Sequence, residues 1–121
     1  MKKENVIKEK SHSFALRMIK AYKFLSIEQR EFVLSKQMLR SGTAVGALIR
    51  EAEFAQSTPD FIHKLSIALK ETNETEYWIS LLKDSEYISQ EAFNSIHFDC
   101  VELIKLLTSI INTSKQKIIN C

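Results

Sequence analysis

The sequence predicts an all-α protein that folds as an antiparallel, up-down-up-down four-helix bundle. Four segments place apolar side chains at alternating steps of three and four residues, which keeps one face of each helix buried. The 121 residues include only two Gly and one Pro, too few for the many tight turns of a sheet protein. The three connections are short, so neighbouring helices should run antiparallel. The length suits a single domain, residues 1–121.

The first two helices are predicted at about residues 4–25 and 28–55. Ser26 stands three residues before Gln29, which is the spacing of a capping box at the start of a helix. The buried stripe of the first helix is Ile7, Ser11, Phe14, Met18, Ala21 and Leu25, and that of the second is Leu34, Met38, Ser41, Val45, Leu48, Ala52 and Ala55.

The third and fourth helices are predicted at about residues 59–87 and 90–117. Thr58 precedes Pro59, which suits the first helical position, and Asp60 complements the helix dipole. Ser89 can cap the fourth helix. The stripes are Phe61, Leu65, Ala68, Thr72, Thr75, Ile79 and Leu82 in the third helix, and Phe93, Ile96, Cys100, Leu103, Leu107 and Ile110 in the fourth.

Both glycines fall inside the second predicted helix, at Gly42 and Gly46. Each costs a helix about 1 kcal/mol relative to alanine, so a packing role should offset that cost. Their spacing places both on one face, where another helix can approach closely, either within the subunit or between subunits. A phosphate-binding loop is not indicated, because the spacing and the lysine of that motif are missing.

The charge distribution is uneven although the net charge is only +2. Residues 1–25 contain seven Lys or Arg and two Glu, whereas residues 56–88 contain three Lys and six Asp or Glu. This segregation fits ion pairs between helices, a solvated basic face, or a face that meets nucleic acid. The candidate nucleic-acid-binding residues are Lys2, Lys3, Lys8, Lys10, Arg17, Lys20 and Lys23.

No segment predicts a membrane span, a secretory leader, a catalytic site or a cofactor site, so we expect a cytoplasmic, non-enzymatic protein. A di-metal bundle needs inward-facing Glu-x-x-His pairs near mid-helix. Glu9 with His12 lies off the buried stripe, Asp60 with His63 lies at a helix start, and His97 has no carboxylate three residues earlier. Cys100 is expected to be a buried thiol, and Cys121 is the last residue.

Residues 32–88 resemble a bacterial four-helix-bundle family first noticed in intervening sequences of 23S ribosomal RNA genes. The resemblance rests on KQMLRSGT (residues 36–43), REA (50–52), DFIHKLSIALKE (60–71) and NETEYW (73–78), with a weaker match at residues 13–17. One departure is Leu48, where family members commonly carry Asn. The residues that form the structural motif of the resemblance are Arg40, Ser41, Gly42, Gly46, Glu51, Lys64, Glu71, Glu74 and Trp78.

The resemblance implies a ring-like homopentamer and a relationship to the accessory protein of diversity-generating retroelements, which associates with a reverse transcriptase and with nucleic acid. The resemblance alone supplies the number five. An oligomer is also expected from apolar residues outside the buried stripes, which a monomer cannot all cover. These residues are Phe24, Phe32, Leu39, Ile49, Phe54, Ile62, Leu69, Trp78, Leu81, Ile104 and Ile111.

The polar motif residues are predicted to set the register between helices. Reflecting each helix onto the next about its turn places opposite charges side by side. The expected pairs are Arg40 with Glu74 or Glu71, Glu51 with Lys64, Glu71 with Lys105, and Lys23 with Glu31.

The sequence therefore predicts a homo-oligomeric scaffold or adaptor, with RNA, DNA or a reverse transcriptase as candidate partners for its basic surface. The alternatives are a protein-binding oligomer without a nucleic-acid role and, more distantly, a metal-binding or enzymatic bundle. No small-molecule substrate is indicated.

Overall fold

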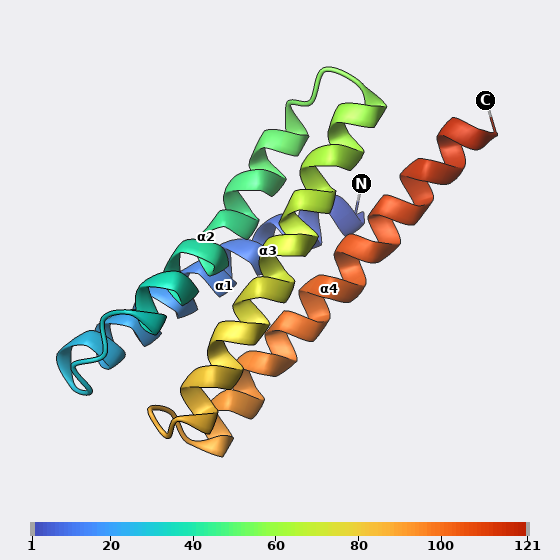
Figure 1. Ribbon diagram of the computed structural model, residues 1–121. Helices are drawn as coiled ribbons and strands as arrows, with labels where there is room; N and C mark the ends of the chain where they lie inside the picture. The colour runs from blue at the N-terminus through green and yellow to red at the C-terminus, as the bar shows by residue number, and fades with distance from the viewer. Residues whose placement is uncertain (1, 121) are drawn as a thin grey trace.

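The computed structural model of the chain describes residues 2–120, and it describes side chains for residues 4–120. Within this range there are four helices and no strand: α1 (Lys2–Ile27), α2 (Leu34–Glu53), α3 (Thr58–Asp84) and α4 (Gln90–Ile119). Each helix packs against the next, and α1 also contacts α4, although less extensively. Figure 1 shows α2, α3 and α4 alternating in direction, with α1 behind them. The predicted all-α four-helix fold is confirmed.

The core consists mainly of the predicted stripes. Phe14, Met18, Val45, Leu65 and Leu107 are among its fully buried side chains. The polar stripe positions are buried as well, because each hydroxyl bonds inside the core. For example, Thr72 Oγ1 donates to the carbonyl of Ala68 at 2.8 Å. The spacing of apolar residues thus identified the inward faces of all four helices.

Two of the apolar residues that were set apart for an interface belong to the core instead. Ile49 and Ile111 are buried, whereas Leu48, which the spacing placed on the stripe, is only half-buried. A helix turns by 100° per residue, so positions at the edge of a stripe can exchange with their neighbours when helices cross at an angle. Phe24, Phe32 and Phe54 are exposed as expected, and Leu39, Ile62, Leu69 and Trp78 pack partly against the core.

The predicted start of the second helix is wrong. α1 continues to Ile27, and Ser26 Oγ donates to the carbonyl of Tyr22 at 2.7 Å rather than capping a new helix. α2 begins at Leu34, where the carboxylate of Glu31 accepts the N–H groups of Val33, Leu34 and Ser35 at 2.7–3.1 Å. A helix start leaves such amides without intrahelical partners. One buried glutamate therefore has the capping role that the Ser26–Gln29 spacing had suggested.

Serine side chains cap the other two helices. α3 begins at Thr58, one residue before the predicted start at about residue 59, and its cap is Ser57. Ser57 Oγ accepts the N–H of Asp60 at 3.2 Å, and Asp60 Oδ2 in turn accepts the N–H of Gln56 at 3.2 Å. At α4 the predicted cap is confirmed, since Ser89 Oγ accepts the N–H of Ala92 at 3.0 Å.

The two glycines allow α1 to approach α2 within the subunit. A Cβ atom at Gly42 would lie 2.8 Å from Met18 Sδ and closer still to Met18 Cγ, inside van der Waals contact. A Cβ atom at Gly46 would lie 3.5 Å from the carbonyl oxygen of Ser11, an ordinary contact. The close approach therefore depends mainly on Gly42. Over the described residues, no helix is both long and apolar enough to cross a bilayer.

Candidate functional site

The basic side chains of α1 fall into two groups. Lys8 pairs with Glu53 of α2 at 2.9 Å, while Lys10 pairs with Glu102 and Arg17 with Asp99 of α4, at 3.0 and 2.7 Å. These three cations connect α1 to its neighbours. All three side chains remain partly exposed, and their partners lie on α2 and α4 rather than on the acidic third helix.

The second group keeps its charge free for other partners. Lys20 and Lys23 are exposed, and within residues 4–120 neither has a carboxylate partner. The side chains of Lys2 and Lys3 lie outside the described residues. The candidate nucleic-acid-binding set of α1 is thus reduced, over the side chains that are described, to two unpaired cations near its C-terminal end.

The motif residues of α2 and α3 form a partly exposed polar network. Arg40 binds Glu74, and it also lies 3.4 Å from Glu71. Trp78 Nε1 donates to the same Glu74 carboxylate at 3.0 Å. Beneath them, Thr75 Oγ1 donates to Ser41 Oγ at 2.8 Å inside the core. The network joins two helices across 34 residues of sequence, so it fixes their register.

A second predicted pair of this interface is present, because Lys64 Nζ lies 3.1 Å from Glu51 Oε1. The predicted Lys23–Glu31 and Glu71–Lys105 pairs are not observed. Glu31 is committed to the start of α2, and Glu71 lies beside Arg40. Reflection about a turn therefore worked at the tight α2–α3 connection and failed at the connections whose length or helix boundaries had been misjudged.

The histidines are spread over the bundle. His97 Nε2 of α4 lies 2.6 Å from Glu76 Oε2 of α3, and its ring stacks on Phe93, over which Lys83 Nζ lies at 4.4 Å. His12 and His63 are exposed. No three His, Cys, Asp or Glu side chains of the described residues are grouped as metal ligands would be. The His97 cluster is an electrostatic contact between α3 and α4.

Exposed apolar and cationic side chains gather where α1 ends and α2 begins, a surface that we call the α1–α2 tip. Ile27 and Val33 are 69% and 72% exposed. Of these apolar residues, only Phe24 and Phe32 were expected from the sequence. The second helix was predicted to start at about residue 28, so the loop before Leu34 was not recognised. Glu28 and Gln29 are also exposed in this segment. The exposed apolar and cationic residues of the α1–α2 tip are Lys20, Lys23, Phe24, Ile27, Arg30, Phe32, Val33 and Lys36.

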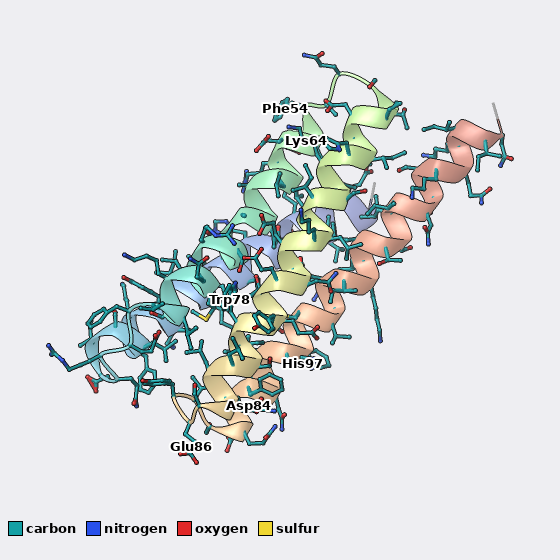
Figure 2. All side chains as sticks on the ribbon, viewed as in Figure 1. Phe54, Lys64, Trp78, Asp84, Glu86 and His97 are labelled. Atoms are coloured by element: carbon teal, nitrogen blue, oxygen red, sulfur yellow. The ribbon has the colours of Figure 1, made fainter. Side chains whose placement is uncertain are left out.

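A cleft of about 930 Å³ adjoins the α1–α2 tip, between α1 and the α3–α4 connection. Lys20 and Phe24 of the tip line it from one side, and Tyr87 lines it from the other. Figure 2 labels Asp84 and Glu86 at this end of the bundle, opposite the end that carries Phe54 and Lys64. A smaller cavity of about 480 Å³ lies at that opposite end, lined by the start of α1 and the end of α4.

Comparison with known proteins identifies the family. The sequence profile of the family described as "23S rRNA-intervening sequence protein" matches residues 3–109. The chain is also similar to a crystal structure of a protein with unknown function from the S23 ribosomal protein family of Bacteroides thetaiotaomicron. That similarity has 62% sequence identity and a TM-score of 0.90, covering 91% of this chain and 98% of that chain. A comparison with curated proteins found no match. The chain belongs to the 23S rRNA-intervening sequence protein family.

Proposed function

We propose that the protein is a non-enzymatic, cytoplasmic, homo-oligomeric scaffold. It binds nucleic acid, or an enzyme that acts on nucleic acid, through its basic half, residues 1–53. The observation that carries this proposal is the exposure of large apolar side chains on a chain whose core is already filled. Leu16, Ile27, Val33, Phe54 and Phe98 are all more than half exposed. Such surface is usually covered by a partner.

The charge distribution supports a head-to-tail assembly of identical subunits. Residues 1–53, which include α1 and α2, contain 11 Lys or Arg and 6 Asp or Glu, whereas residues 54–121 contain 6 and 9. Opposite charges on opposite halves let one subunit present its basic half to the acidic half of the next. Contacts between unlike surfaces close into a ring when the rotation permits. Five subunits is the number that the family resemblance suggests.

A nucleic-acid role is supported by cations that the fold leaves unpaired. Lys20, Lys23, Arg30, Lys36 and Arg50 belong to the basic half, and none has a carboxylate partner among the described residues. Phosphates are attracted to such surfaces without any need for base-specific contacts. A reverse transcriptase is the protein partner that the family resemblance suggests.

A specific observation favours the alternative of an oligomer without a nucleic-acid role. Lys8, Lys10 and Arg17 were candidates for phosphate contacts, yet each is used in an ion pair between helices.

A non-enzymatic role is supported by the chemistry of the buried nucleophiles. Burial raises the pKa of the Cys100 thiol to about 12, and the hydroxyl of Ser41 bonds to its own helix.

Two measurements test the proposal. Light scattering coupled to size exclusion at low micromolar concentration should give a multiple of the 14.0 kDa subunit mass. A mass equal to one subunit would disprove the scaffold, and a multiple other than five would disprove only the pentamer. Titration with labelled RNA and DNA at two salt concentrations should show binding that weakens steeply with salt. Absence of binding at low salt would leave the alternative oligomer.

A further inference from the structure

The backbone of the α1–α2 tip is held in place by a buried carboxylate. Glu31 accepts three backbone N–H groups at the start of α2, and Ser35 Oγ donates to the Glu31 carbonyl at 2.7 Å. The N–H of Glu31 donates to the carbonyl of Leu25 at 2.9 Å. The loop is therefore bonded to both of the helices that it joins, and the residues on either side of Glu31 have a defined position.

That defined position includes a strained residue. Arg30 has φ of 54°, the left-handed region that residues with a Cβ atom adopt at a cost. Glu86 adopts a similar φ of 69° just after the end of α3, so the conformation belongs to the helix C-terminus, where residues past the last turn often adopt it. Phe32 and Val33 follow in the same loop, and both remain exposed.

The exposed side chains combine two chemistries. Phe24 and Phe32 are each nearly half exposed, and no ring–ring or cation–ring contact in the described part of the chain involves them. Lys20, Lys23, Arg30 and Lys36 are exposed cations of the same tip, and none has a carboxylate partner among residues 4–120. The carboxylate of Glu31 is buried and accepts backbone N–H groups, so Glu28 is the one exposed acidic residue of segment 20–36.

We propose that the α1–α2 tip binds single-stranded nucleic acid. Bases stack on Phe24 and Phe32, and phosphates lie against the four cations of the tip. Single-strand binding surfaces combine these two features, because every base has a face that an aromatic ring can stack on. The cleft of about 930 Å³ continues from Phe24 to Tyr87, which provides room and a further ring beside the tip.

A double strand would use only half of this surface. Its bases are paired and stacked inside the duplex, so the cations would contact phosphates while the two rings remained unused. The single strand is therefore the occupant for which both the aromatic and the basic side chains have a role. This inference rests on the nucleic-acid part of the proposed function and locates it.

The test compares a labelled oligothymidylate of about 15 nucleotides, the upper site size of a single-strand-binding domain, with a duplex of the same length, using fluorescence anisotropy at low and moderate salt. The double variant Phe24→Leu, Phe32→Leu keeps the apolar character but removes both stacking surfaces. It should weaken single-strand binding by about tenfold or more while leaving duplex binding unchanged. The matched control is Tyr77→Leu, which removes an exposed ring of α3 and should change neither affinity.

The cations are tested through the salt dependence. Lys23→Gln with Lys36→Gln should lower the slope of log K against log salt by about 0.7 for each phosphate that is no longer neutralised. Lys70→Gln with Lys105→Gln changes two lysines of α3 and α4 that have no carboxylate partner within residues 4–120, and it should leave the slope unchanged. Circular dichroism and oligomer mass are measured for every variant, so that misfolding or disassembly is seen directly.

Each outcome decides a different claim. If the wild-type protein binds neither nucleic acid, the nucleic-acid part of the proposed function fails, and this inference fails with it. If the wild-type protein binds and the Phe24, Phe32 variant binds the single strand equally well, the tip is not the site although the function stands. If that variant loses oligomer mass instead, a second copy of the chain covers the tip and the inference is overturned.

Discussion

The guanidinium of Arg40 on α2 binds the carboxylate of Glu74 on α3, and the same carboxylate accepts a hydrogen bond from Trp78 Nε1. Glu74 therefore links one charged partner on the facing helix to one aromatic partner on its own helix. The side chain of Arg40 is 49% exposed and that of Glu74 is 32% exposed. At this exposure an ion pair contributes little net stability, but it disfavours any alignment that would bring like charges together.

Reversal of the Arg40 charge should destabilise the bundle. Arg40→Glu would place a third carboxylate beside Glu71 and Glu74, and we expect a loss of about 1–2 kcal/mol in the free energy of unfolding. Adding Glu74→Arg should restore part of it. Urea unfolding of the two single variants and the double variant measures the coupling.

A matched control is Arg50→Glu, at an exposed position of the same helix where the arginine has no carboxylate partner in the described part of the chain. This variant should cost less than Arg40→Glu. Strictly additive losses in the Arg40, Glu74 double variant would show that the two residues do not interact in solution.

The two glycines should respond in opposite directions to alanine. Alanine favours the helix by up to about 1 kcal/mol over glycine. At Gly46 the added Cβ meets only ordinary contacts, so Gly46→Ala should stabilise the protein. At Gly42 the Cβ would overlap the side chain of Met18, so Gly42→Ala should cost about 1–3 kcal/mol. Thermal unfolding of both variants is the measurement, and equal melting temperatures would contradict the packing argument.

The sequence was sufficient for the parts of the fold that depend on periodic burial and local caps. The stripes of apolar residues predicted the inward faces, and the cap of α4 at Ser89 followed from its position before Gln90. Opposite charges at fixed distance from a tight turn predicted the Arg40–Glu74 and Glu51–Lys64 pairs. Each of these depends on residues close in sequence or on simple reflection of one helix onto the next.

The α1–α2 tip could not be predicted in this way. Its geometry depends on Glu31, which accepts backbone N–H groups two to four residues ahead. The local spacing of residues does not show that Glu31 caps the second helix while Ser26 bonds back to its own helix. Which cations remain unpaired likewise depends on distant partners: Lys10 and Glu102 are 92 residues apart. Ion pairs between α1 and α4 form only when the whole bundle is assembled, so the pattern of residues within one helix does not predict them.

Glu31 should make the free energy of unfolding depend on pH in the acid range. Burial raises the pKa of this carboxyl, but hydrogen bonds from Leu34, Ser35 and Val33 outweigh it and hold the pKa below the ordinary value of 4.5. Because the pKa is lower in the folded state, the carboxylate contributes stability above about pH 4.5. That contribution is lost as the pH falls through the folded-state pKa.

The change that tests this is Glu31→Gln, which keeps one acceptor and removes the charge. It should cost about 1 kcal/mol at pH 7, in the range of other capping residues, and Glu31→Ala should cost more. The difference between Glu31→Gln and the wild type should shrink in urea unfolding at progressively lower pH. A constant difference from pH 7 to pH 3 would rule out this role for the charge.

Cys100 should be chemically inert in the folded protein. Burial, reinforced by the negative charges of Glu76 and Asp99, raises the pKa of its thiol to about 12, and the thiolate is the reactive form. In a Cys121→Ser variant, iodoacetamide at pH 7.5 should therefore modify Cys100 only in urea, as mass spectrometry can show. Rapid modification without urea would mean that the core around Cys100 opens readily.

The outward face of α1 should take part in subunit assembly. Leu16 and Ile19 are exposed there, pointing away from the buried side chains of Phe14 and Met18, so neither contributes much to the core of its own subunit. Leu16→Lys should accordingly reduce the oligomer mass in light scattering while leaving helicity unchanged, because burying an unpaired charge at an interface is costly. Ser13→Lys, at an exposed polar position of the same helix, serves as the control. If both variants retain the wild-type mass at micromolar concentration, the assembly uses another face, and the exposed Phe98 of α4 becomes the next position to change.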